Sequence, residues 1–90
     1  MVREATVEAY LHNRVKALGG VTFKLAPTTV GMPDRMVVLP GGRILLVEMK
    51  RDGGHLSAVQ KVFHARLADL GVHVFTLYGK MDVDDFLMLC

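Results

Sequence analysis

Apolar positions along the 90-residue chain follow two different periods. From Arg3 to Leu18 they recur every three or four residues, as on one face of a helix, and Gly19-Gly20 then provides a helix stop. Residues 57–70 repeat this helical spacing and end at Gly71. The shorter segment 81–89 is expected to form a last helix.

The segments between these helices have the composition of β-strands. Strands are predicted at residues 21–26, 34–40, 43–50 and 72–78, which are rich in β-branched and aromatic residues. The second and third are apolar on both faces in their middles, as central strands are. The order αβββαβα predicts a single α/β domain over residues 1–90, with a central mixed sheet flanked by helices.

Three charged residues interrupt the apolar hairpin "GMPDRMVVLPGGRILLVEMK". Glu48 and Lys50 are two apart on a strand and therefore share a face. Whether Asp34 joins them depends on the turn. A two-residue turn at Gly41-Gly42 would pair Arg35 with Glu48 and turn Asp34 away. A three-residue loop, Gly41-Gly42-Arg43, would pair Asp34 with Lys50 and bring all three polar groups together.

If the two carboxylates converge, they repel each other unless a cation lies between them. Carboxylate oxygens, a backbone carbonyl and water are the ligands that Mg²⁺ or Mn²⁺ accepts, and the carbonyl of Met49 is a candidate third ligand. Lys50 would then orient water or neutralise charge on a phosphate, which predicts metal-assisted phosphodiester hydrolysis. The alternative is a simple ion pair of Asp34 with Lys50 or Arg35, because such triplets are common by chance.

The extended pattern resembles the VRR-NUC (virus-type replication–repair nuclease) family of the PD-(D/E)xK nuclease superfamily. The resemblance rests on Gly31-Met32-Pro33-Asp34-Arg35, on Val47-Glu48-Met49-Lys50 and on Ser57-x-x-Gln60, in this order and spacing. It spans nearly the whole chain and implies a restriction-endonuclease-like domain. In this reading Asp34 and Glu48 are metal-binding carboxylates and Lys50 is the catalytic lysine.

Two further site residues are implied by the resemblance. Gln60 matches a glutamine on the helix after the E-x-K strand, although Ser57 and Gln60 also form a capping-box sequence that explains them structurally. A glutamate on the first helix usually completes the site. Glu4 and Glu8 compete for this place, and Glu8 is preferred because it continues the apolar stripe towards the sheet.

The resemblance also implies a function. The resemblance to stand-alone members of this size, typically encoded by phages, implies a homodimer that cuts branched DNA such as four-way (Holliday) junctions with Mg²⁺ or Mn²⁺. Larger relatives carry the same module within DNA-repair enzymes. Alternatives are a nuclease for flaps or duplex ends, or a non-catalytic nucleic-acid-binding or dimerisation module. From the sequence alone, phosphate contacts are expected from Arg35, Arg51, Lys24 and Lys61.

Composition adds limits to this picture. A net charge of +2 permits nucleic-acid binding without requiring it, whereas 51% hydrophobic residues in so short a chain favour self-association. Phe86, Leu87 and Leu89 are expected either to cover the sheet or to lie in a dimer interface. Without a signal peptide or membrane span in the pattern, a cytoplasmic protein of a bacterial or phage-infected cell is expected. No role is predicted for the four histidines, of which only His55 falls near the site: His12, His55, His64 and His73.

Overall fold

The fold follows the predicted order of elements. The computed structural model describes residues 4–90, so the expected helix start at Arg3 lies outside the described residues. The helices and strands are α1 (Glu4–Ala17), β1 (Val21–Lys24), β2 (Arg35–Leu39), β3 (Arg43–Met49), α2 (Ala58–Asp69), β4 (Val74–Leu77) and α3 (Lys80–Leu89). No helix of this described range is long and apolar enough to cross a membrane.

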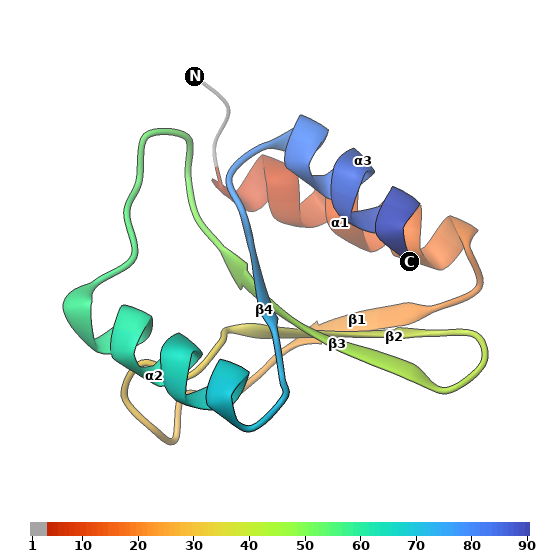
Figure 1. Ribbon diagram of the computed structural model, residues 1–90. Helices are drawn as coiled ribbons and strands as arrows, with labels where there is room; N and C mark the ends of the chain where they lie inside the picture. Colours follow the sequence, from red (N-terminus) through yellow and green to blue (C-terminus); the bar gives the residue numbers. More distant parts are fainter. Residues whose placement is uncertain (1–3) are drawn as a thin grey trace.

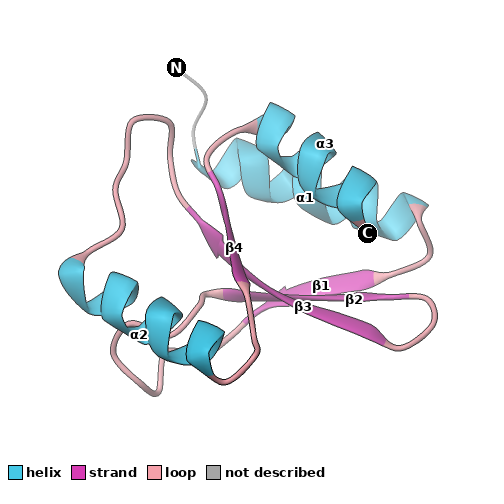
Figure 2. Ribbon diagram, in the orientation of Figure 1, coloured by secondary structure: helices cyan, strands magenta, loops and turns pink. Residues whose placement is uncertain are grey.

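The four strands form one mixed sheet in the order β1-β2-β3-β4. β1, β2 and β3 are antiparallel neighbours, and β4 pairs parallel to β3. A parallel pair needs a crossover connection, which α2 provides here. α1 and α3 lie on one face of the sheet and α2 lies on the other (Figures 1 and 2).

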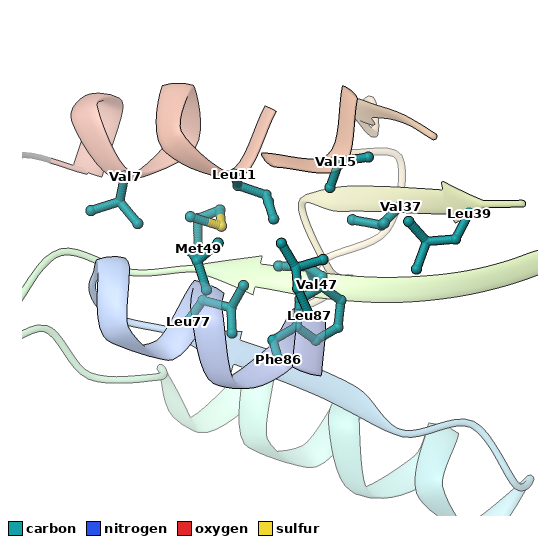
Figure 3. Packing of buried hydrophobic residues seen from close by; sticks show 11 residues of the cluster. Val7, Leu11, Val15, Val37, Leu39, Val47, Met49, Leu77, Phe86 and Leu87 are labelled. Carbon is teal, nitrogen blue, oxygen red and sulfur yellow. The ribbon is translucent and has the colours of Figure 1, made fainter. Parts of the chain in front are cut away.

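The hydrophobic core lies between the sheet and the α1/α3 pair. Val7, Leu11 and Val15 project from α1 at helical spacing and are fully buried. They pack with side chains of the strands and of α3 (Figure 3). Phe86 and Leu87 are buried in this cluster, whereas Leu89 is exposed, so the C-terminal segment covers the sheet.

The opposite face of the sheet is only partly covered. Val21, Phe23 and Ile44 point to this face and are 57%, 45% and 63% exposed. α2 covers the β4 end of this face without burying any of its own residues completely. An apolar sheet surface therefore remains open to solvent beside α2.

Glycines allow two close approaches that fix the frame of the site. A Cβ on Gly20 would run into the carbonyl oxygen of Val38, so only glycine lets the chain leave α1 this close to β2. Gly31 has φ +87°, and a Cβ there would lie 2.8 Å from the carbonyl oxygen of Val59. The segment before β2 is thus seated against the first turn of α2.

Candidate active site

The hairpin register brings the two predicted carboxylates to one face, although by a different pairing from either one expected. The connecting loop has three residues, Pro40 to Gly42, and Leu39 pairs with Arg43. Continued beyond the pair Arg35–Val47, this register sets Asp34 opposite Glu48.

The predicted pairing of Asp34 with Lys50 is therefore wrong. Asp34 lies opposite Glu48, because the loop consists of residues 40–42 and not of residues 41–43. Arg43 belongs to the strand, and its NH1 donates a hydrogen bond of 2.6 Å to the carbonyl oxygen of Cys90. The turn lies one residue earlier than expected, and Gly41 and Gly42 adopt the positive φ angles that it requires. Because the expected and the observed loop both have three residues, Asp34 still lies on the same face of the sheet as Glu48.

Asp34 is tied directly to the E-x-K strand. The backbone N–H of Met49 donates to Asp34 Oδ1 at 3.1 Å. Burial raises the pKa of the Asp34 carboxyl, and the negative charge of Glu8 adds to the rise; the Met49 hydrogen bond, a side-chain hydrogen bond with Glu48 and the charge of Arg35 oppose it. A hydrogen bond between two carboxyl groups requires a proton on one of them.

The backbone of Met49 contributes a further oxygen on this side. The N–H and C=O of one strand residue point towards the same neighbouring strand. Because the Met49 N–H reaches Asp34, and Lys50 N on the next residue reaches Leu77 O of β4 at 3.0 Å, the Met49 carbonyl points to the Asp34 side. β2 begins only at Arg35, which leaves this carbonyl beside the Asp34 carboxylate.

Glu8 approaches from the other face of the sheet. It is held by Lys24, whose Nζ lies 3.5 Å from Glu8 Oε2, and it acts on Asp34 through its charge. Among the described residues, no three His, Cys, Asp or Glu side chains gather closely enough to hold a metal ion. Glu8 is thus an electrostatic neighbour of the carboxylate pair. The competing side chain of Glu4 lies outside what the structure describes.

A histidine that the sequence reasoning left without a role lies at the site. His64 Nε2, on α2, is 3.6 Å from Glu48 Oε1, and these side chains are 12% and 4% exposed. Burial lowers the pKa of His64, and the charges of Lys50 and His73 lower it further. Lys50 therefore lies near the same ring, whereas His55, the histidine singled out from the sequence, is exposed. The missed signal is the four-residue spacing from Gln60, which puts both residues on one face of α2.

Gln60 is engaged in the capping box that its sequence context also predicts. Its Oε1 accepts from Ser57 N at 2.8 Å, while Ser57 Oγ accepts from Gln60 N at 3.1 Å. The cap satisfies backbone N–H donors at the N-terminus of α2, the helix that follows the E-x-K strand. Gln60 therefore has a structural role here, one turn before His64.

The four basic residues expected to contact DNA lie in different environments. Arg51 and Lys61 are exposed, and the side chain of Lys24 is 70% exposed although it pairs with Glu8. Arg35 is only 8% exposed on the face covered by α1, and its Nε and NH1 are buried without hydrogen-bond partners in the described chain. Its burial leaves little of the guanidinium available to DNA.

The donor set fits a hard divalent cation. Two carboxylates and one carbonyl supply oxygen ligands only, and the remaining positions would be taken by water or a phosphate oxygen. The pKa of Asp34 is raised chiefly by burial, and a cation beside the carboxylate would oppose this rise because it favours the charged form. Mg²⁺ and Mn²⁺ suit this set better than a softer metal would.

Known proteins are similar to this chain in sequence and in fold. The family model described as the VRR-NUC domain matches residues 5–81. A protein of Acyrthosiphon pisum secondary endosymbiont phage 1, named "Putative nuclease p44", is 40% identical over 78 residues, covering 86% of this chain and 84% of that protein. A solved structure described as a VRR-NUC domain has a TM-score of 0.84 at 30% identity, covering 98% of this chain and 97% of the other.

Proposed function

The chain belongs to the VRR-NUC family of nuclease domains, and we propose that it is a Mg²⁺- or Mn²⁺-dependent DNA endonuclease that cuts branched DNA, such as four-way junctions, as a homodimer. The observation that carries the proposal is the convergence of Asp34 and Glu48 at the end of the central strands. A purely structural ion pair does not require two carboxyl groups to face each other.

In this proposal the cation is held by Asp34, Glu48 and the Met49 carbonyl. When bound, it polarises a phosphoryl oxygen and makes a water molecule more acidic. Glu8 contributes negative charge that favours a cation at Asp34. Gln60 maintains the N-terminus of α2, where backbone N–H groups favour a nearby anion such as a DNA phosphate.

Lys50 is the proposed catalytic cation. It follows Glu48 by two residues and reaches the same side of the sheet, beside His64. A lysine here can orient the attacking water and neutralise the negative charge that develops on the phosphate. For both tasks the ammonium group must lie beside Asp34 and Glu48 without taking the place of the cation between them.

DNA contacts are proposed for the basic side chains around this end of the sheet. Arg51 follows Lys50 directly, Lys61 lies on the first turns of α2, and Lys24 lies beside Glu8. Such contacts bind phosphates without reading sequence. The buried Arg35 is assigned instead to the electrostatic environment of Asp34, whose pKa it lowers.

A homodimer is supported by the open sheet face. Val21, Phe23 and Ile44 leave apolar surface exposed on a small domain, and a second copy is the simplest cover for it. Two active sites related by a twofold axis match the paired incisions that a symmetric junction requires. The dimer and the branched substrate therefore support each other.

The experiment that tests this function is a substrate panel. Labelled four-way junction, 5′ flap and linear duplex are incubated with the protein and Mg²⁺ or Mn²⁺, with EDTA as the metal-free control. We expect cleavage of the junction at symmetric positions and no cleavage in EDTA. Absence of cleavage of every substrate with both metals would refute the nuclease proposal, whereas preferential cleavage of flap or duplex would refute the junction assignment alone.

A further inference from the structure

His64 contacts one of the proposed metal-binding carboxylates from a separate element. Glu48 is on β3 and His64 is on α2, and the atoms that meet are Oε1 and Nε2, 3.6 Å apart. Both side chains are almost completely withdrawn from solvent. His64 is therefore one of the side chains that surround the Glu48 carboxylate.

The imidazole nitrogen that faces Glu48 is available for this contact. His64 Nε2 is buried and forms no hydrogen bond within the described part of the chain. A buried donor without an acceptor destabilises the folded state. Hydrogen bonds of active sites are often long before the ligands bind and shorten in the loaded complex.

The ring can act here as a donor. His64 Nε2 lies 3.6 Å from Glu48 Oε1, so a small movement of either side chain brings the two atoms within hydrogen-bond distance. A neutral imidazole carries one N–H. Directed at Oε1, this N–H would hold the carboxylate and leave its second oxygen for the side on which Asp34 lies.

α2 itself is weakly seated, which makes the contact matter for the helix as well. None of its residues is fully buried, and Val59 and Val62 are 49% and 71% exposed. The backbone approach of Gly31 to Val59 holds only the first turn. The His64 contact lies one turn after Gln60, so it reaches the sheet where apolar packing is thin.

We propose that His64 is a positioning residue of the metal site, which fixes the Glu48 carboxylate through Nε2 and thereby links occupation of the site to the seating of α2. This inference rests on the proposed metal-dependent function. It assigns to α2 a part in loading the site in addition to any contact with DNA. Outer residues that orient metal ligands typically change metal affinity or activity 10–100-fold when removed, on the order of what we expect here.

The test measures Mn²⁺ binding to the full chain without DNA, by the loss of the free-ion electron paramagnetic resonance signal. His64→Ala is compared with His64→Gln, whose amide N–H can still donate to Glu48, and with His12→Ala, an exposed residue of α1, as the control. We expect His64→Ala to weaken binding about 10–100-fold, His64→Gln to recover most of the affinity, and His12→Ala to bind as the wild type does.

Hydrogen exchange provides the second readout. Mn²⁺ should slow amide exchange in residues 58–69 of the wild type and of His64→Gln, but much less in His64→Ala. Equal Mn²⁺ affinity of His64→Ala and wild type would overturn the inference. So would equal weakening by Ala and Gln together with equal loss of thermal stability, since that indicates a packing role.

The outcome separates this inference from the proposed function. A wild type that binds Mn²⁺ and cleaves DNA, with His64→Ala unchanged in both, removes only the role of His64. A wild type that neither binds Mn²⁺ nor cleaves removes the metal-dependent function, and the inference falls with it.

Discussion

Asp34 is an ionisable residue in a position where burial disfavours its charged form. Its carboxyl is half-buried, receives the Met49 N–H and faces Glu48, and its pKa is raised chiefly by burial. A residue kept for stability alone would not need to be ionisable there. His64, which contacts Glu48, shares a face of α2 with Gln60, but the sequence does not show that this face meets the sheet, because that depends on tertiary packing.

Asp34→Asn should stabilise the metal-free protein at neutral pH. Because the pKa of Asp34 is raised in the fold, the folded state holds this proton more tightly than the unfolded chain does. The contribution of Asp34 to the free energy of unfolding is greatest below pH 3.8, the pKa of the unfolded chain. It declines as the pH rises through the raised pKa of the folded state and stays constant above it. Thermal unfolding from pH 4 to pH 8 should show this decline in the wild type and its loss in Asp34→Asn; parallel curves would contradict the account.

Lys50→Met should separate catalysis from metal binding. If Lys50 stabilises charge on the phosphate, its loss lowers kcat about 10²–10³-fold while Mn²⁺ affinity stays close to that of the wild type. Single-turnover cleavage together with Mn²⁺ titration measures the two effects. Lys16→Met, an exposed lysine on α1, is the matched control. A kcat unchanged by Lys50→Met would remove Lys50 from the mechanism.

At the level of elements, the hairpin and the first connection set the geometry of the site. The order of strands and helices was predictable from periodicity, and the confluence of Asp34 and Glu48 from a loop of odd length. The residues of that loop were not predictable, because loops 40–42 and 41–43 leave the same strand residues on the buried face. The burial of Arg35 likewise follows from strand parity and from the position of α1 over the sheet.

Gly20→Ala should destabilise the fold by about 1–3 kcal/mol, because the added methyl group is forced against the carbonyl oxygen of Val38. Gly79→Ala is the matched control, since a Cβ there meets nothing within 4 Å and φ is −157°. Urea unfolding of both variants measures the difference. Equal midpoints for the two variants would show that the α1–β1 connection can move away from β2.

On the scale of the whole molecule, the core is one-sided. α1 and α3 bury most of the apolar side chains on one sheet face, whereas α2 leaves apolar side chains of the other face in contact with solvent. The high hydrophobic content is explained by this open face as much as by the core. The sequence indicated an excess of apolar residues, but only the packing of helices shows on which face the excess lies.

Ile44→Lys should weaken self-association if this open face forms the dimer. Ile44 is 63% exposed on the uncovered side of β3, and a charge there would be buried by a second copy. Met88→Lys on α3, where Met88 is 84% exposed, is the control on the opposite side. Light scattering at micromolar concentration should give a monomer for Ile44→Lys and a dimer for Met88→Lys. A dimer in both would place the interface elsewhere.

The central claim is that the Asp34–Glu48 pair holds the cation that drives phosphodiester cleavage. The most direct measurement is the single-turnover rate of cleavage of a four-way junction against Mg²⁺ concentration, for the wild type and Asp34→Asn in parallel. We predict a rate that saturates with Mg²⁺ in the wild type and is lower by about 10³-fold or more in Asp34→Asn, which remains folded. Cleavage by Asp34→Asn at the wild-type rate, with the same dependence on Mg²⁺, would contradict the account.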